Sequence, residues 1–163
     1  MALNSLPMNF FNNPNRIPES YGLKTAGGLI AYFLLMSVLG LGHHHDLRYL
    51  NVFIQVVGIY FALKKFKKAH GGHMNYFRGL VTGVATGAIA SAVLAIFLFV
   101  YMSIDTAFMQ GVIDNEPMGR YLNPYISSFA VALEGFFSGF LFTFIIINYV
   151  DTDNVNDPVG ESK

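Results

Sequence analysis

Residues 76–104 read YFRGLVTGVATGAIASAVLAIFLFVYMSI and carry a single charged side chain, Arg78, close to their start. A transmembrane helix needs about 20 mostly apolar residues to cross a hydrocarbon core of about 30 Å. This segment is longer than that, so we expect a membrane-spanning helix that is tilted or that protrudes from the bilayer.

Three further apolar segments surround it, at about residues 21–42, 47–63 and 125–149. The second segment is short for a span. We expect its helix to include one further turn formed by the lysines that follow, whose long side chains can reach the membrane surface. The sequence therefore predicts an all-α fold: an integral membrane four-helix bundle made by residues 21–150. A polar tail at residues 1–20 precedes this domain, and an acidic tail at residues 151–163 follows it.

The composition excludes several classes of protein. Charged residues are 12% of the 163 residues, about half of the usual ~25%. That is too few to cover a soluble globule, while 16 Phe and 9 Tyr are unlike a disordered chain. The ten basic and ten acidic residues balance, which argues against nucleic-acid binding. With no Cys, disulfides, thiolate nucleophiles and Cys-based metal sites are excluded.

The distribution of Lys and Arg predicts the orientation. In a four-span topology eight of the ten fall on one side, namely Arg16, Lys24, Lys64, Lys65, Lys67, Lys68, Arg78 and Lys163. Only Arg48 and Arg120 fall on the other side. Because positively charged loops stay in the cytoplasm, we expect both termini and the lysine segment to be cytoplasmic.

The segment 76–104 also carries a stripe of small residues, one at every fourth position. It consists of Gly79, Gly83, Gly87, Ser91 and Ala95. Residues four apart lie on one face of a helix, and small side chains there allow a second helix to approach closely. The last apolar segment repeats the pattern with Gly135 and Gly139. We predict that these glycines form a helix-packing interface, with a helix of this chain or of another.

Glu134 is the one acidic residue inside an apolar segment. It follows Tyr125 by about nine residues, which at about 1.5 Å per residue places it roughly 13–14 Å below the outer membrane boundary. A charge near the centre of the membrane costs at least about 2.5–3.5 kcal/mol. We therefore expect the carboxyl of Glu134 to face the bundle interior and to be protonated.

Gln55, Ser91 and Ser138 are the polar residues expected near this depth. Hydrogen bonds from such a layer satisfy a neutral carboxyl, so one interpretation is that Glu134 holds helices together. The other is a proton-carrying or ion-binding site. We favour the first because the apolar segments offer no second acid and no base at that depth.

The histidines give a weak metal candidate. His43, His44, His45 and Asp46 could ligate a divalent cation such as Zn²⁺. However, adjacent histidines on a helix point in different directions, so we favour a polar, titratable loop. We expect no cofactor and no enzymatic activity, because the sequence offers no phosphate-binding loop, no zinc-protease helix and no catalytic triad.

The region from Lys64 to Asp105 shows a more specific pattern. The basic stretch KKFKKAHGG (64–72) leads through HMNYFRG (73–79) into the Gly-rich segment, which ends with YMSID (101–105). This pattern resembles a family of small bacterial inner-membrane proteins that have a domain of unknown function and four predicted helices. Family members often have an acid after the aromatic cap, where this chain has Arg78. The resemblance implies a four-helix protein of the bacterial inner membrane and transfers no catalytic residue.

These observations predict a small, non-enzymatic, multi-pass protein that acts as an accessory or structural subunit. Its expected partners are the lipid bilayer and either other membrane subunits or further copies of itself. The alternative function is a small proton-linked transporter or channel that uses Glu134. We also predict that Lys64, Lys65, Lys67 and Lys68 bind anionic lipid headgroups, although simple topogenic charge explains them equally well.

Overall fold

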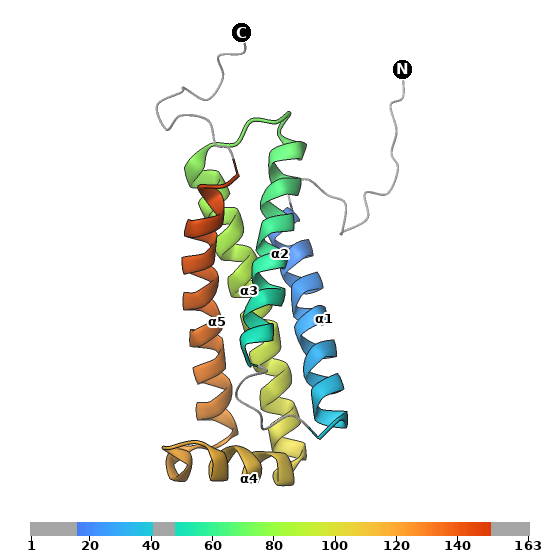
Figure 1. Ribbon diagram of the computed structural model, residues 1–163, viewed down its shortest axis with the longest axis vertical. Helices are drawn as coiled ribbons and strands as arrows, with labels where there is room; N and C mark the ends of the chain where they lie inside the picture. The colour runs from blue at the N-terminus through green and yellow to red at the C-terminus, as the bar shows by residue number, and fades with distance from the viewer. Residues whose placement is uncertain (1–15, 41–47, 151–163) are drawn as a thin grey trace.

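The computed structural model describes residues 16–40 and 48–150, and the secondary-structure elements of this part of the chain are all helices joined by short turns. Four long helices run side by side, each antiparallel to the previous one: α1 (Ile17–Val38), α2 (Arg48–Ala69), α3 (Tyr76–Ile104) and α5 (Pro124–Ile147) (Figure 1). A short helix, α4 (Thr106–Asn115), lies crosswise over one end of the bundle. One turn of 3-10 helix, η4 (Gly119–Tyr121), then leads into α5.

Three of the described helices, α1, α3 and α5, are long and apolar enough to cross a membrane. This finding supports a membrane protein. Helix α2, whose last two turns contain four lysines, is not among these candidate spans. The described residues therefore form five α-helices with three candidate spans, where the sequence predicted four helices that all span the membrane.

The helix bounds differ from the predicted ones for local reasons. Helix α1 begins at Ile17, earlier than predicted, and its second residue is Pro18. Proline is compatible with a first helical turn, where its missing N–H has no partner to lose. Helix α2 continues to Ala69 because lysine is a good helix former. Gly71 and Gly72 then end it, with φ angles of 70° and 91° that favour glycine.

Helix α4 lies within residues 105–124, between the third and the fourth apolar segments predicted from the sequence. Asp105 caps it, since its Oδ1 accepts a hydrogen bond of 2.9 Å from the backbone N–H of Phe108. Phe108, Met109 and Val112 turn toward the bundle, while Gln110 and Asp114 are exposed. The apolar face of α4 therefore closes one end of the bundle.

Helix α3 contacts the other three long helices and also α4. Of its most apolar stretch 44% is buried, against 22% for those of α1 and α5. Two apolar clusters form the core. The cluster nearer α4 contains Leu29, Ala90, Leu94, Leu98, Met102 and Met109. The cluster at the opposite end contains Ile59, Leu63, Met74, Ile146 and Ile147.

The outer face of α5 is strongly apolar. Its exposed side chains include Phe129, Phe136, Phe137, Phe140, Leu141 and Phe144. A contiguous apolar surface of this kind is typical of a face that meets lipid or another protein.

Candidate functional site

The glycines of the small-residue stripe form the contact between α3 and α5. A Cβ on Gly87 would lie 3.2 Å from Cα of Gly139, and a Cβ on Gly83 would clash with the side chain of Thr143. Gly135 faces the side chain of Ser91 in the same way. The helix that packs against the stripe of α3 is thus α5 of the same chain.

A polar layer lies between the two apolar clusters, centred on the buried side chain of Gln55. Its Nε2 donates to the carbonyl oxygen of Gly135 at 2.8 Å and to Oγ of Ser91 at 3.3 Å. Its Oε1 accepts from Oγ of Ser138 at 3.2 Å. One amide from α2 therefore joins α3 and α5.

The same glycines make room for this amide. A Cβ on Gly139 would approach Nε2 of Gln55 to 2.9 Å, and a Cβ on Gly87 would approach it to 3.5 Å. Close packing of α3 on α5 and the hydrogen bonds of Gln55 therefore depend on the same small residues.

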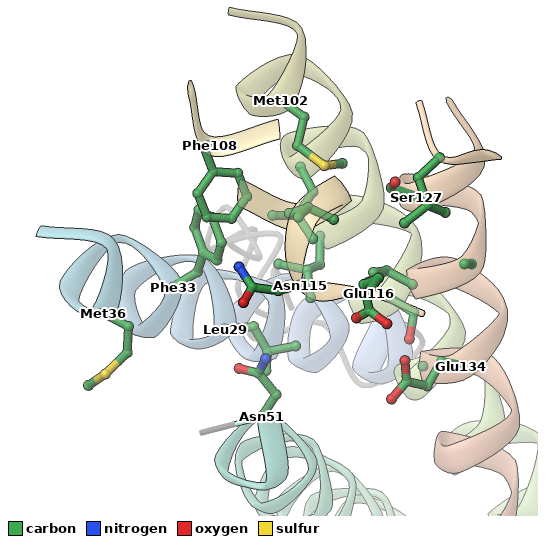
Figure 2. Close-up of a pocket in the computed structure, with 18 of the residues that line it drawn as sticks. Leu29, Phe33, Met36, Asn51, Met102, Phe108, Asn115, Glu116, Ser127 and Glu134 are labelled. Carbon is green, nitrogen blue, oxygen red and sulfur yellow. The ribbon is translucent and has the colours of Figure 1, made fainter. Parts of the chain in front are cut away.

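Glu134 is exposed in the isolated chain and lines a cavity that Gln55, Ser91 and Ser138 also line. The sequence analysis placed these four residues in one layer. In the structure the amide of Gln55 bonds to Ser91, Ser138 and the Gly135 carbonyl. The carboxyl of Glu134 projects into the cavity (Figure 2), whose wall includes the residues of this network.

This cavity has a volume of about 540 Å³ and lies in the half of the bundle nearer α4. All five α-helices contribute to its wall. Much of the wall is apolar and is formed by Leu29, Phe33, Leu94, Leu98, Met102 and Phe108. The sequence did not reveal this cavity, because it arises from the spacing of helices that are far apart in the chain.

An aromatic cluster fixes α4 over this end of the bundle. The ring of Phe108 packs edge-to-face on Phe33 and on Tyr101, with centroids 5.4 and 5.3 Å apart. Tyr101 also forms a hydrogen bond of 2.8 Å with Ser37 of α1. These contacts tie α1, α3 and α4 together.

A comparison with protein families identifies the family of this chain. The family model described as "Protein of unknown function (DUF4199)" matches residues 20–146. The chain belongs to the DUF4199 family. The match covers all four long helices except the first turn of α1 and the last residue of α5. No curated protein and no solved structure matches the chain.

Most of the described basic residues of this DUF4199 protein gather at the end of the bundle opposite α4. Lys64, Lys65, Lys67 and Lys68 form the last turns of α2. Arg78 lies in the first turn of α3, which Asn75 caps by accepting a hydrogen bond of 3.0 Å from the N–H of Phe77. Nζ of Lys24 lies 4.9 Å from the ring centre of Tyr21, so this amine turns back toward the same end.

The metal candidate from the sequence lies outside the described residues. It consists of His43, His44, His45 and Asp46. Among residues 16–40 and 48–150 of this DUF4199 protein, no group of three or more His, Cys, Asp or Glu side chains is arranged to hold a metal ion.

Proposed function

We propose that all four long helices cross the bacterial inner membrane, with both termini on the cytoplasmic side. Helix α2 has 22 residues, or about 33 Å at about 1.5 Å per residue, which suffices for a core of about 30 Å. It packs against the three apolar helices along the bundle. Its lysines lie in the final turns, where long side chains can reach the lipid headgroups.

The charges at the two ends of the bundle support this orientation. Described basic residues at the end opposite α4 are Arg16, Lys24, Lys64, Lys65, Lys67, Lys68 and Arg78. The end with α4 contains two basic residues, Arg48 and Arg120, together with Asp105, Asp114 and Glu116. By the positive-inside rule the lysine end is cytoplasmic. The bacterial location rests on the sequence resemblance of the region from Lys64 to Asp105.

Within this membrane bundle, the function we propose is that of a small, non-enzymatic accessory subunit that packs against other membrane helices or a second copy of the chain. The hydrogen bonds of Gln55 are the observation that carries this proposal. The polar atoms in the middle of the bundle serve to join α2, α3 and α5, which is the role of polar groups in membrane helix packing. The exposed aromatic face of α5 offers a surface for a partner.

Purification of the full chain in a mild detergent tests this function. We expect it to co-migrate with a stoichiometric membrane protein or as a defined oligomer. Substitution of Phe137 or Phe140 by Ala on the outer face of α5 should weaken that association. A monomer with no stoichiometric partner would contradict the accessory role.

One observation favours a second function, a proton-linked transporter or channel. The carboxyl of Glu134 reaches the cavity rather than a closed core, so a transported proton or ion has access to it. On this interpretation Glu134→Gln abolishes proton flux in liposomes and leaves the fold intact. Equal flux through both proteins, or flux no greater than that of empty liposomes, would exclude this second function.

A further inference from the structure

The cavity at the α4 end has the size and wall composition of a ligand-binding pocket. Its volume of about 540 Å³ lies within the range of about 300–1,000 Å³ that is usual for small-molecule sites. Such sites combine mostly apolar walls with a few polar groups, and this cavity does so (Figure 2). The polar groups indicate the chemistry of the ligand.

Ser127 is the first of these groups. Serine and threonine in helices commonly donate a hydrogen bond to the carbonyl oxygen four residues earlier. The described hydroxyls that do so are those of Thr25, Thr82, Thr86, Ser91, Ser103, Ser128 and Thr143. Ser127 is 8% exposed and lines the cavity, yet its Oγ has no hydrogen-bond partner among the described residues.

Asn51 is the second. Its Oδ1 is buried at the cavity wall and also has no hydrogen-bond partner among the described residues. An amide oxygen can only accept hydrogen bonds, and a serine hydroxyl can accept as well as donate. A buried acceptor without a partner is costly, so a ligand that donates hydrogen bonds would relieve both positions.

The acidic and aromatic residues of the cavity wall also favour a ligand that donates hydrogen bonds. Glu116 and Glu134 both line it, and their carboxyl groups project into the same space in Figure 2. None of the described lining residues is Lys, Arg or His. The rings of Phe33 and Phe108 also form part of the wall, and aromatic faces attract cations. Carboxyl groups, an amide carbonyl acceptor and aromatic rings together favour a cationic donor over an anion.

We propose that this cavity binds an amphiphilic amine, a molecule with one ammonium group and a compact apolar body. The ammonium group donates hydrogen bonds toward Asn51 and Ser127 and lies near the carboxyl groups of Glu116 and Glu134. The apolar body packs against Leu29, Leu94 and Phe108. This inference goes beyond the accessory role and applies whether or not the protein transports protons.

Three probes of the same length and different charge test the proposal. They are hexylamine, hexanol and hexanoate, added at neutral pH to the full chain in maltoside micelles. A ligand that binds the native state raises thermal stability in proportion to the logarithm of its concentration over Kd. We expect hexylamine to stabilise the protein with an apparent Kd at least tenfold lower than that of hexanol, and hexanoate to give no shift. Equal shifts for hexylamine and hexanol would overturn the proposal, since only the apolar body would then matter.

Two variants with matched charge locate the site. Glu134→Gln keeps the shape of the side chain and removes a carboxylate from the cavity wall. Asp114→Asn removes a carboxylate at the same end of the bundle, on the exposed face of α4, where Asp114 pairs with Gln110. We expect Glu134→Gln to weaken hexylamine binding by roughly tenfold, which is the usual contribution of one charge-assisted hydrogen bond. We expect Asp114→Asn to leave hexylamine binding unchanged. Equal weakening in both variants would show a general surface attraction and would overturn the assignment.

Ser127→Ala provides an independent check should Glu134→Gln fail to fold. It removes one oxygen atom that has no hydrogen-bond partner among the described residues, so the stability of the ligand-free protein should not fall. We expect it to weaken hexylamine binding severalfold and to leave hexanol binding unaltered. Unchanged hexylamine affinity in this variant would remove Ser127 from the site and overturn the proposed contact.

Discussion

Gly87→Leu probes the closest approach between α3 and α5. A Cβ at this position would lie 3.2 Å from Cα of Gly139, which is a backbone atom of the facing helix. A flexible side chain can rotate away from such a contact, but a backbone atom moves only with its helix. The leucine therefore forces the two helices apart and pulls Gln55 away from the Gly135 carbonyl, to which it bonds at 2.8 Å.

The matched control is Gly27→Leu. Gly27 is an exposed glycine inside α1, and a Cβ there would meet nothing within 4 Å. Both substitutions gain helix propensity, about 0.8–1 kcal/mol when glycine is replaced by a good helix former. This gain cancels when the two variants are compared. The remaining difference is the cost of overpacking, about 1–3 kcal/mol or somewhat more for a side chain as large as leucine.

Thermal unfolding of both variants in detergent measures this difference. For a chain of this length 1 kcal/mol corresponds to a change in Tm of about 2–4 °C. We therefore expect Gly87→Leu to melt roughly 2–12 °C below Gly27→Leu. Equal Tm values would refute the reasoning, because they would show that α3 and α5 do not pack through their glycines.

Three further substitutions test other parts of the structure. Gln55→Leu should lower the free energy of unfolding by about 0.6–2 kcal/mol, because it removes the hydrogen bonds by which one amide of α2 joins Ser91 of α3 to Ser138 and the Gly135 carbonyl of α5. Unchanged stability would contradict the polar layer. Phe108→Ala should speed hydrogen exchange across α4, since each aromatic pair contributes about 0.5–1.5 kcal/mol, and unchanged exchange would mean that other contacts hold α4. Replacement of Lys64, Lys65, Lys67 and Lys68 by Gln should weaken association with anionic liposomes, by about 1 kcal/mol per residue at low salt, whereas equal association would leave the lysines with a topogenic role alone.

The long helices could be predicted from the sequence because α1, α3 and α5 each contain a long apolar run and because local signals mark where helices begin and end. The glycines at 71 and 72 and the cap at Asn75 are local signals of this kind. The depth arithmetic for Gln55 and Ser91 used only the rise of a helix, and the structure joins the two by a hydrogen bond. Such features can be predicted because they depend on the spacing of residues along one helix or on two residues lying at the same membrane depth in two helices.

Features that depend on the lateral arrangement of helices could not be read in this way. Helix α4 is short and half-polar, so no apolar run marks it, although Asp105 before an apolar pair was an available cap signal. The cavity depends on how α2 and α4 are placed around α3, and no spacing within a single segment encodes that. For the same reason the sequence did not mark Ser127 and Asn51 as residues of one cavity.

The central claim is that α2 crosses the membrane with the other three long helices. Because the chain has no cysteine, single cysteines introduced as Arg16→Cys, His70→Cys and Asp114→Cys can be labelled with a membrane-impermeant maleimide in intact cells. If all four helices cross, Arg16→Cys and His70→Cys label only after permeabilisation, and Asp114→Cys labels in intact cells. If α2 does not cross, the positions at 16 and 70 lie on opposite sides of the membrane, and labelling of one but not the other in intact cells would contradict the four-span account.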